Sequence, residues 1–379
     1  MLSSYGGKNC WAFKDWFEIN MRINGNVPSE FGFPNKPIVP IMCFEGPNAS
    51  GKTCALKVLT FLCSFCEQSF SYAPNQPVPY DSFFNNTDDS SFFITFFLND
   101  DISTEYTYEV VFSAKMVSSE KLFVSKGRSK QILFSRSGNK VTKSIYPSVP
   151  LRDNASIIST LHQYGINEIS PVFDFFHNTS SNIIYMGRVD EYYLNDPANY
   201  YHDNTGLLKT VVSELRKLDT GISDIEIRDF TDQNNKKQYY SIFLNDSEGG
   251  PKPLNHWTMS TGTKLLYSKL NEIMEVLATG GVMMFDELDC HLHSSLVPII
   301  LDYFLNPEKN KNNAQLLFTS HDSALLDSAK KYRTYLFEKH LGESICYRID
   351  ELPKEMTSRN DRSLEQVYKS GVIGGVPNV

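Results

Sequence analysis

The sequence has no long hydrophobic run. Its most apolar candidate helix, from Ala55 to Cys66, is about 12 residues long and is interrupted by Lys57, whereas a helix needs roughly 20 apolar residues to cross a bilayer. The amino-terminal residues from Met1 to Lys8 also lack the basic and then apolar pattern of a secretory signal. These absences exclude a membrane-spanning protein and predict a soluble, cytoplasmic chain that makes no membrane contact.

The seven cysteines lack the paired spacing of a disulfide framework. Their odd number and scattered positions are typical of reduced thiols in a cytosolic chain. Cys63 and Cys66 form a Cys-x-x-Cys pair, but no second Cys/His pair stands at finger spacing, so we interpret both as structural. An excess of positive charge is also missing, since 36 Lys and Arg stand against 44 Asp and Glu. Any nucleic-acid contact must therefore come from a local basic patch.

Hydrophobic residues, by contrast, are plentiful. They make up 41% of the chain, with 26 Phe and 20 Tyr, which is typical of a folded globular protein and excludes disorder. A length of 379 residues allows either one large α/β domain with an insertion or two ordinary domains. No long heptad run occurs, so we expect no extended coiled coil.

A glycine-rich loop is the first motif that carries chemistry. The segment Gly46-Pro-Asn-Ala-Ser-Gly-Lys-Thr53 follows a short apolar run, 38–45, and precedes an apolar helical run that begins at Cys54. Strand, loop and helix in this order are the context that a Walker A motif requires. Backbone N–H groups of the loop and the positive end of the helix form a site for phosphates. We expect Lys52 to reach the β- and γ-phosphate oxygens and the Thr53 hydroxyl to bind Mg²⁺.

A second apolar run ends in two acids and is typical of a Walker B strand. It extends from Gly280 to Phe285 and is followed by Asp286 and Glu287. Asp286 is expected to hold Mg²⁺ and Glu287 to polarise the attacking water as the catalytic base. Neighbouring strand residues point to opposite faces, but a turn at the strand end lets both face one ligand. Alone, the pattern fits a strand that ends in a solvated acidic loop equally well.

Between these motifs, an amphipathic helix predicted over 265–277 begins after Met259-Ser-Thr-Gly-Thr-Lys264. Ser260 and Gly262 therefore lie at a helix amino terminus, where free N–H groups can bind a phosphate. Without the neighbouring motifs, Ser260 is equally well explained as an ordinary helix cap.

A further apolar strand, starting at Gln315, ends in Thr-Ser-His321. Ligands of open α/β sheets collect at the carboxyl edge of the strands, so His321 is placed to contact a γ-phosphate and act in catalysis. A lone His at such a position is more often a surface or core residue. The order of the preceding motifs favours the catalytic interpretation.

Together these motifs resemble those of the ABC-type ATPases of the OLD, RecF and SMC clan, particularly short bacterial AAA ATPases of phage-defence loci. The resemblance includes Asp289 with His293, and the ending from Tyr368 to Pro377 is similar to the Tyr-x-x-Gly-x-x-Gly-x-x-Pro close of that group. It spans nearly the whole chain, with a loose match over 150–250. It implies an α/β fold with a mostly parallel core sheet, an antiparallel β subdomain and a helical insertion.

The resemblance also implies the ligands and the assembly. ATP and Mg²⁺ are the expected cofactors, and Thr53 and Asp286 the expected metal ligands. In such ATPases the signature loop binds the γ-phosphate held by the other subunit, which implies a head-to-tail homodimer or a higher homo-oligomer. The expected nucleotide-binding residues are Gly46, Pro47, Asn48, Ala49, Ser50, Gly51, Lys52, Thr53, Cys54, Ser260, Gly262 and Asp289.

The sequence departs from the pattern of that clan in three places. Ala49 replaces the glycine that is more usual there, which a small side chain tolerates. The Leu-Ser-Gly-Gly-Gln signature of transporter ATPases is missing, which argues against transport. The glutamine that senses Mg²⁺ is not identified by pattern, and Gln131 and Gln163 are both candidates.

The remaining segments predict the domain organisation. Strands over 92–98, 104–112, 121–125 and 131–135, with 15–21, are expected to form the antiparallel subdomain. A helix over 207–218 and a hairpin of 222–230 with 238–244 follow. We expect an ATPase lobe at 1–150, a helical and hairpin insertion at 151–250, and the signature, Walker B and switch-histidine part at 251–379.

Three functions remain as hypotheses. The resemblance favours an ATP-hydrolysing sensor or regulator of a separate effector, a nuclease or toxin, in anti-phage defence. The alternative is a RecF-like ATPase of DNA repair or DNA ends. Lys126, Arg128 and Lys130 form a basic turn that can contact nucleic acid or a partner, but a solvated turn explains them better. A stand-alone nuclease is disfavoured, because fewer than 60 residues follow His321 and no spare carboxylate cluster is visible.

Overall fold

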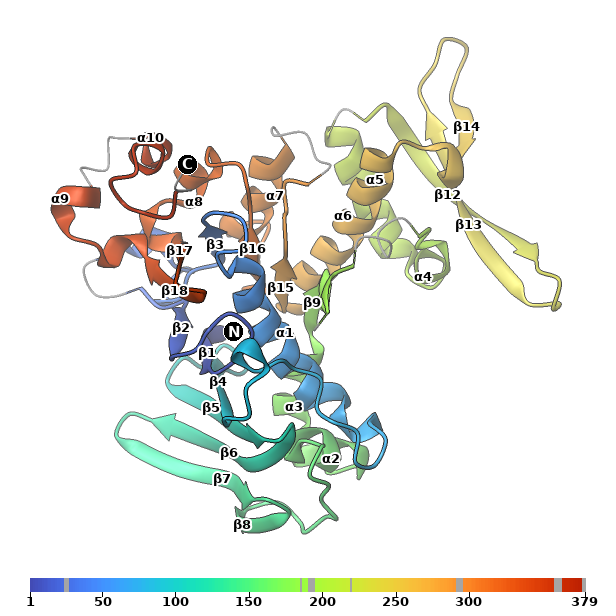
Figure 1. Cartoon of the computed structure of the whole chain (residues 1–379). Coiled ribbons are helices and arrows are strands. Elements are labelled where there is room, and N and C mark those ends of the chain that lie inside the picture. Colours follow the sequence, from blue (N-terminus) through green and yellow to red (C-terminus); the bar gives the residue numbers. More distant parts are fainter. Residues whose placement is uncertain are drawn as a thin grey trace.

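The computed structural model describes residues 1–23, 27–184, 186–189, 195–218, 220–290, 296–357 and 363–376. Two large sheets organise these residues around one long helix, α1, and a third small sheet projects from the body (Figure 1). The expected α/β fold, with a mixed sheet of mostly parallel strands and a separate antiparallel sheet, is confirmed. No described helix combines the length and apolar character that a bilayer crossing requires.

The antiparallel sheet has seven strands in the order β2-β1-β4-β5-β6-β7-β8. Four of the five predicted strands fall on β4 to β7, and the fifth falls on β2; β1 and β8 were not predicted. The strands are β1 Leu2–Lys8, β2 Phe17–Asn20, β4 Ser90–Phe97, β5 Thr104–Ser113, β6 Met116–Lys126, β7 Ser129–Ser137 and β8 Lys140–Ser144.

The mixed sheet has six strands in the order β18-β17-β3-β16-β15-β9. All neighbours are parallel except β17 and β18. The strands are β3 Ile41–Glu45, β9 Thr179–Ser181, β15 Val282–Phe285, β16 Gln315–Thr319, β17 Thr334–His340 and β18 Glu343–Arg348. Because β3, β15 and β16 are parallel, the three polar motifs that follow them meet at one edge of the sheet.

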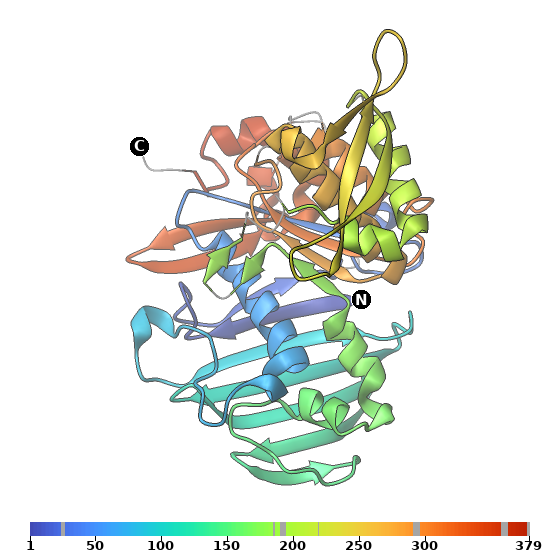
Figure 2. The ribbon, with the colours of Figure 1, turned by 90° about the vertical axis from the view of Figure 1, so that its right-hand side faces the viewer.

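Helix α1, Lys52–Gln68, is buried on nearly every side because it lies between the two sheets. Its Phe61 ring packs against Phe92 and Phe112 of the antiparallel sheet, while its Thr60 hydroxyl contacts Met284 of the mixed sheet. Figure 2 shows α1 running along one face of the antiparallel sheet. This two-sided burial explains why the sequence of α1 is apolar nearly all round.

The small sheet belongs to a projecting arm. It consists of β12 Ile222–Thr231, β13 Lys237–Asn245 and β14 Lys252–Asn255, and it follows α4 Ala198–Asp203 and α5 Thr205–Lys217. The predicted hairpin is present, with its turn closed by the Asp232 N–H donating to the Lys236 carbonyl. Figure 1 shows these strands extending away from the body beside α5.

Residues 151–181 belong to the two large sheets and not to the arm. Helices α2 Ile157–Gln163 and α3 Ser170–His177 pack on α1, and Phe176 contacts Phe96 in the antiparallel sheet. Strand β9 then joins the mixed sheet, and a short hairpin of β10 Ile183–Ile184 and β11 Gly187–Arg188 follows. We therefore propose that the inserted unit is narrower than 151–250 and is confined to 195–258.

The carboxy-terminal part completes the lobe that carries β15 and β16. Its hydrophobic cluster of Leu326, Leu336, Ile349, Leu364, Tyr368 and Ile373 fixes the last described segment on the mixed sheet. The remaining α-helices are α6 Thr261–Thr279, α7 Leu296–Leu305, α8 Leu325–Ala329, α9 Lys354–Thr357 and α10 Leu364–Lys369.

Candidate nucleotide site

The loop from Gly46 to Gly51 connects β3 to α1 with a backbone that glycine favours. Gly46 has φ 149° and Gly51 has φ 109°, and a Cβ atom on them would lie 2.4 Å from the Phe337 carbonyl oxygen and 2.5 Å from Ser344 Oγ. Ala49 adopts φ 61°, so an alanine occupies a left-handed position that a glycine tolerates better. The two glycines are therefore required by close approach as well as by conformation.

Lys52 turns back over the loop. Its Nζ atom donates to the Gly46 carbonyl at 2.5 Å and to the Pro47 carbonyl at 3.1 Å. Burial lowers the pKa of Lys52, an effect that the nearby Glu45 carboxylate opposes. Ser50 Oγ is buried in the same loop and has no hydrogen-bond partner among the residues that the structure describes. A lysine cation and a buried hydroxyl beside the backbone of this glycine-rich loop suit a bound phosphate.

The end of β15 meets the start of α1. Thr53 Oγ1 lies 3.0 Å from Asp286 Oδ1 and 3.1 Å from Oδ2, although the two residues are separated by 233 positions in the chain. Thr319, the last residue of β16, donates its hydroxyl to Asp286 Oδ1 at 2.8 Å. Burial raises the pKa of Asp286, against the lowering effect of hydrogen bonds from Thr319 and Thr53.

Asn182 holds the backbone of Asp286 from the neighbouring strand. The Asp286 N–H donates to Asn182 Oδ1 at 2.7 Å, and Asn182 Nδ2 donates to the Asp286 carbonyl at 2.9 Å. Asn182 is buried and directly follows β9, the edge strand beside β15. The Asn182 side chain therefore extends the hydrogen bonding between β9 and β15 by one residue beyond the end of β9. It fixes the backbone of Asp286 at the point where the carboxylate of that residue begins.

Glu287 occupies a turn that brings it to the same side as Asp286. Its φ is 53°, a left-handed value that side-chain residues rarely adopt, and its N–H donates to Thr319 Oγ1 at 2.7 Å. Its carboxylate forms an ion pair with Arg188 and lies 3.5 Å from His321 Nε2. The two acids thus face one region, as expected from a turn at the strand end.

The donor set fits Mg²⁺ and a triphosphate. The Thr53 hydroxyl and the Asp286 carboxylate are hard oxygen donors, and Mg²⁺ in such sites takes one or two carboxylates together with substrate phosphates. Among the described residues, no group of three or more His, Cys, Asp or Glu could hold a metal on its own. Thr53 and Asp286 therefore suit Mg²⁺ that is bound together with nucleotide phosphates.

The signature residues lie elsewhere in the chain. Ser260 Oγ accepts from the Thr263 N–H at 3.2 Å and caps α6, with Gly262 in the first turn. Within the described ranges, neither residue forms a hydrogen bond with the phosphate loop. Ser260 is exposed at this helix amino terminus.

The loop after Glu287 links two of the expected residues. Asp289 Oδ2 accepts from the His321 N–H at 3.2 Å. Lys269 of α6 is buried below this loop and donates to the carbonyls of Leu288 and Cys290 at 3.4 and 3.5 Å. Helix α6 thus supports the loop that carries Asp289. His293 and Pro377, expected from the resemblance, lie outside the described residues.

Hydrogen-bond networks add residues that sequence motifs did not single out. Asn182 and Arg188 come from the segment after β9, which has no motif, and their contacts connect positions about 100 residues apart. The sequence did offer a signal for Thr319, because this residue stands two positions before His321 at the end of the same predicted strand. The glutamine candidates lie in another region: Gln131 is in β7 and Gln163 ends α2, both in the part of the molecule built on the antiparallel sheet.

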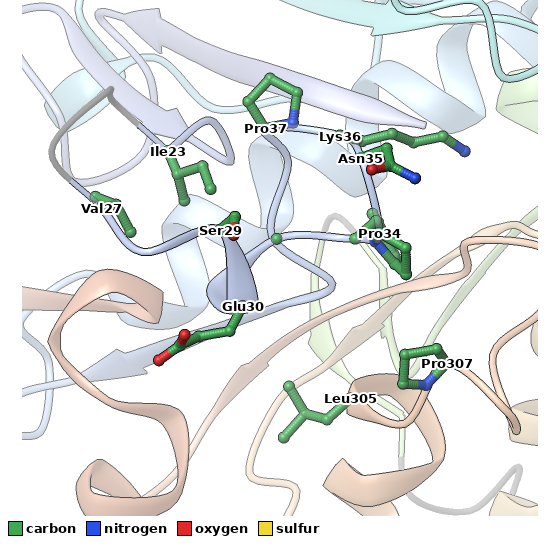
Figure 3. Close-up of a pocket in the computed structure, with 12 residues that line it drawn as sticks. Ile23, Val27, Ser29, Glu30, Pro34, Asn35, Lys36, Pro37, Leu305 and Pro307 are labelled. Carbon is green, nitrogen blue, oxygen red and sulfur yellow. The ribbon is translucent and has the colours of Figure 1, made fainter.

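Two hollows lie at opposite edges of the mixed sheet. One of about 760 Å³ is bordered by Glu45 to Asn48, His321 and the 368–371 segment, at the carboxyl edge of β3. The other, of about 750 Å³, lies between the loop before β3, which carries Pro34, and the end of α7, beside Leu305 and Pro307 (Figure 3). Because ligands of such sheets bind at the carboxyl edge, the first hollow belongs to the nucleotide region.

Comparison with known proteins decides the family. Residues 41–327 match the family described as "AAA domain, putative AbiEii toxin, Type IV TA system". The chain belongs to this family. The match begins at the first residue of β3 and ends in α8, so this AAA domain includes the phosphate loop, both acids and His321. None of the curated proteins compared with the chain matches it.

Three solved structures are similar to the chain to different degrees. An SMC head bound to the C-winged helix domain of ScpA superposes with a TM-score of 0.53 at 12% identity, over 92% of this chain and 98% of that chain. An SMC head domain from Thermotoga maritima gives 0.47 at 13% identity with the same coverage. The recombination mediator protein RecF gives 0.37 at 13% identity, over 91% of this chain and 98% of that chain. The first of these likenesses, with a TM-score above 0.5, shows that the chain has the fold of an SMC head.

Proposed function

We propose that the protein is an ATPase that binds Mg-ATP on the 46–53 loop and hydrolyses it with Glu287 as the base. The observation that carries this proposal is the meeting of Thr53 Oγ1 with the Asp286 carboxylate at 3.0 Å across 233 positions of chain. A hydroxyl at the first turn of the loop helix, opposite an acid at the end of a neighbouring strand, is the pair that P-loop NTPases use for Mg²⁺.

Each residue near this pair has a role that its contacts support. When ATP binds, Lys52 Nζ gives up its hydrogen bonds to the Gly46 and Pro47 carbonyls and donates to phosphate oxygens instead. Glu287 takes a proton from water, and His321 borders the same space as a γ-phosphate contact. Bound Mg²⁺ would supply neutralisation of phosphate charge, with Thr53 and Asp286 holding it.

A second copy of the chain is proposed to complete the site. Ser260 and Gly262 stand at the amino terminus of the 19-residue helix α6, exposed and half-buried respectively, and form no hydrogen bond with the phosphate loop of their own chain within the described residues. A helix amino terminus of this kind binds anions. A head-to-tail pair would bring Ser260 of one copy to the γ-phosphate on the other, as the resemblance to SMC-type ATPases implies.

The biological role that we propose is regulation of a separate effector, a nuclease or toxin, in defence against phage. The description of the matched family, which names a putative AbiEii toxin and a type IV toxin–antitoxin system, supports a link to a toxin. The phage-defence part of the proposal comes from the resemblance of the motifs alone. Fold likeness alone does not establish a role, because one fold hosts many functions. The exposed arm of β12, β13 and β14 offers a surface through which an effector can be contacted.

Two variants test the ATPase proposal. Lys52→Ala is expected to lose ATP binding, whereas Glu287→Gln is expected to bind ATP normally and to lose turnover by about 100-fold or more, since a general base contributes roughly 10²–10⁴. Equilibrium binding of a fluorescent ATP analogue and phosphate release provide the two readouts. Wild-type turnover in both variants would refute the assignment of the site.

A DNA-repair or DNA-end-binding ATPase of the RecF kind is the second candidate, and one observation favours it. Residues 121–152 contain eight Lys and Arg and no Asp or Glu, in a chain whose net charge is −8. Lys126, Arg128 and Lys130 are exposed at the β6–β7 turn and form no ion pair within the described residues. Turnover stimulated by a DNA duplex, with steep loss of binding as salt rises, would favour this candidate.

A further inference from the structure

The Glu287 carboxylate is approached on each oxygen by a different side chain. Oε2 forms the ion pair with the Arg188 guanidinium, and Oε1 lies 3.5 Å from His321 Nε2. The exposed fraction of the side chain is 21% for Arg188 and 35% for Glu287, so solvent screens this pair less than it screens a fully exposed bridge. Bases in efficient active sites are commonly oriented by a third group in this way.

The backbone places Arg188 through the same anchor that places Asp286. Strands β10 and β11 pair Ile183 with Arg188, and the Val189 N–H donates to the Asn182 carbonyl at 2.9 Å. The side chain of Asn182 in turn holds the Asp286 backbone, next to Glu287. Arg188 and Glu287 therefore extend from two segments that share one buried asparagine, which leaves little freedom between them.

We propose that Arg188 is a positioning residue for ATP hydrolysis. By holding Oε2, it turns the Glu287 carboxylate so that Oε1 accepts the proton of the attacking water. In that step the water oxygen bonds to the γ-phosphorus, the bond to the bridging oxygen breaks with its electron pair leaving on ADP, and one water proton passes to Glu287. This inference rests on the proposed ATPase function and adds to it the residue that orients the base.

In the sequence, Arg188 lies shortly before the inserted unit that carries the arm. The hairpin that carries Arg188 leads into the inserted unit 195–258, and that unit returns to the body two residues before Ser260. Helix α5 packs on α6, so the unit is tied to the signature helix as well.

Substitution of Arg188 tests the proposal. Arg188→Gln is expected to lower kcat by about 10- to 100-fold with KM for Mg-ATP changed less than about 2-fold, because misorientation of a base impairs the chemical step and leaves binding intact. Arg188→Lys is expected to recover part of the loss, since lysine restores the charge without the planar fork. Arg22→Gln is the matched control: it breaks the Arg22–Glu105 pair at the antiparallel sheet and should leave kcat unchanged.

A double-substitution cycle separates positioning from other roles. In the Glu287→Gln background, with single-turnover hydrolysis as the readout, Arg188→Gln should add less than about a 2-fold loss, because its effect passes through Glu287. Additive losses would overturn the inference and assign Arg188 to the phosphate itself. A higher kcat in Arg188→Gln, or a weaker ATP affinity with a lower melting temperature, would also overturn it. Normal turnover in Glu287→Gln would refute the proposed function and this inference together.

Discussion

The amide of Asn182 is the contact on which the account of the Walker B carboxylate depends most, and Asn182→Ala tests it. The substitution removes two buried hydrogen bonds, of 2.7 and 2.9 Å, and leaves the N–H and carbonyl of Asp286 without them. A buried group that loses its partner costs about 1–3 kcal/mol. We therefore expect the free energy of unfolding to fall by about 2–4 kcal/mol.

The same substitution should impair turnover by more than it impairs folding. Without its backbone anchor, Asp286 no longer keeps its contacts with Thr53 and Thr319, and misplacement of a catalytic group by about 1 Å can reduce a rate by about 100-fold. Urea denaturation gives the stability, and phosphate release per folded molecule gives kcat.

Asn310→Ala provides the control for this experiment. Asn310 is buried and makes three hydrogen bonds of 2.8–2.9 Å to the backbone at Phe304 and Ala314, before the start of β16. Its loss should lower stability by a comparable amount and leave kcat per folded molecule unchanged. The proposed role of Asn182 is refuted if Asn182→Ala lowers the free energy of unfolding by less than about 0.5 kcal/mol. It is also refuted if the folded variant retains normal turnover at 20 °C.

Two further predictions concern the phosphate loop. Burial raises the pKa of Glu45 from 4.5 to about 7. Between these two pH values the folded chain therefore holds a proton that the unfolded chain has released. The free energy of unfolding should fall by about 3 kcal/mol as the pH rises through this window. Urea midpoints at pH 5 to 8 should show this fall in the wild type and lack it in Glu45→Gln; equal slopes would contradict the assignment. Gly51→Ala, whose Cβ would lie 2.5 Å from Ser344 Oγ at φ 109°, should lower ATP affinity at least about 10-fold and stability by about 1–3 kcal/mol. Gly127 also has a positive φ, of 56°, with open space around an added Cβ, so Gly127→Ala should leave the affinity unchanged in the same binding assay.

Local sequence patterns were sufficient for the elements whose own residues determine them. The loop from Gly46 to Thr53 was predicted because glycine, lysine and threonine at that spacing between a strand and a helix have few other uses. The hairpin of β12 and β13 was predicted because alternation and a polar turn occur together. Both depend on interactions within a short stretch of chain.

Strand β1 shows why other parts were missed. Its sequence, Leu2 to Lys8, has small and polar residues that do not favour strands. It forms because β2 and β4 pair with it on both sides, and a Cβ on Gly6 would lie 2.0 Å from the Phe17 carbonyl oxygen. Such close approach is a property of the neighbouring strand and cannot be read from the glycines themselves.

The site shows the same division between local and tertiary information. Asp286 and Glu287 could be identified because they end an apolar run, and their turn was expected. Asn182 and Arg188 could not, because the three-residue strand β9 has no hydrophobic signal and its place beside β15 is set by tertiary pairing. Asn182 and Arg188 therefore emerged only from the structure.

The most direct test of the central claim is a structure of the Glu287→Gln protein with Mg-ATP. The account predicts a γ-phosphate within hydrogen-bond distance of Lys52 Nζ, Mg²⁺ bound by Thr53 Oγ1 and the Asp286 carboxylate, and Ser260 of a second copy at the same phosphate. Nucleotide bound at the opposite edge of the sheet, between Pro34 and Leu305, or Mg²⁺ held without Thr53 and Asp286, would contradict it.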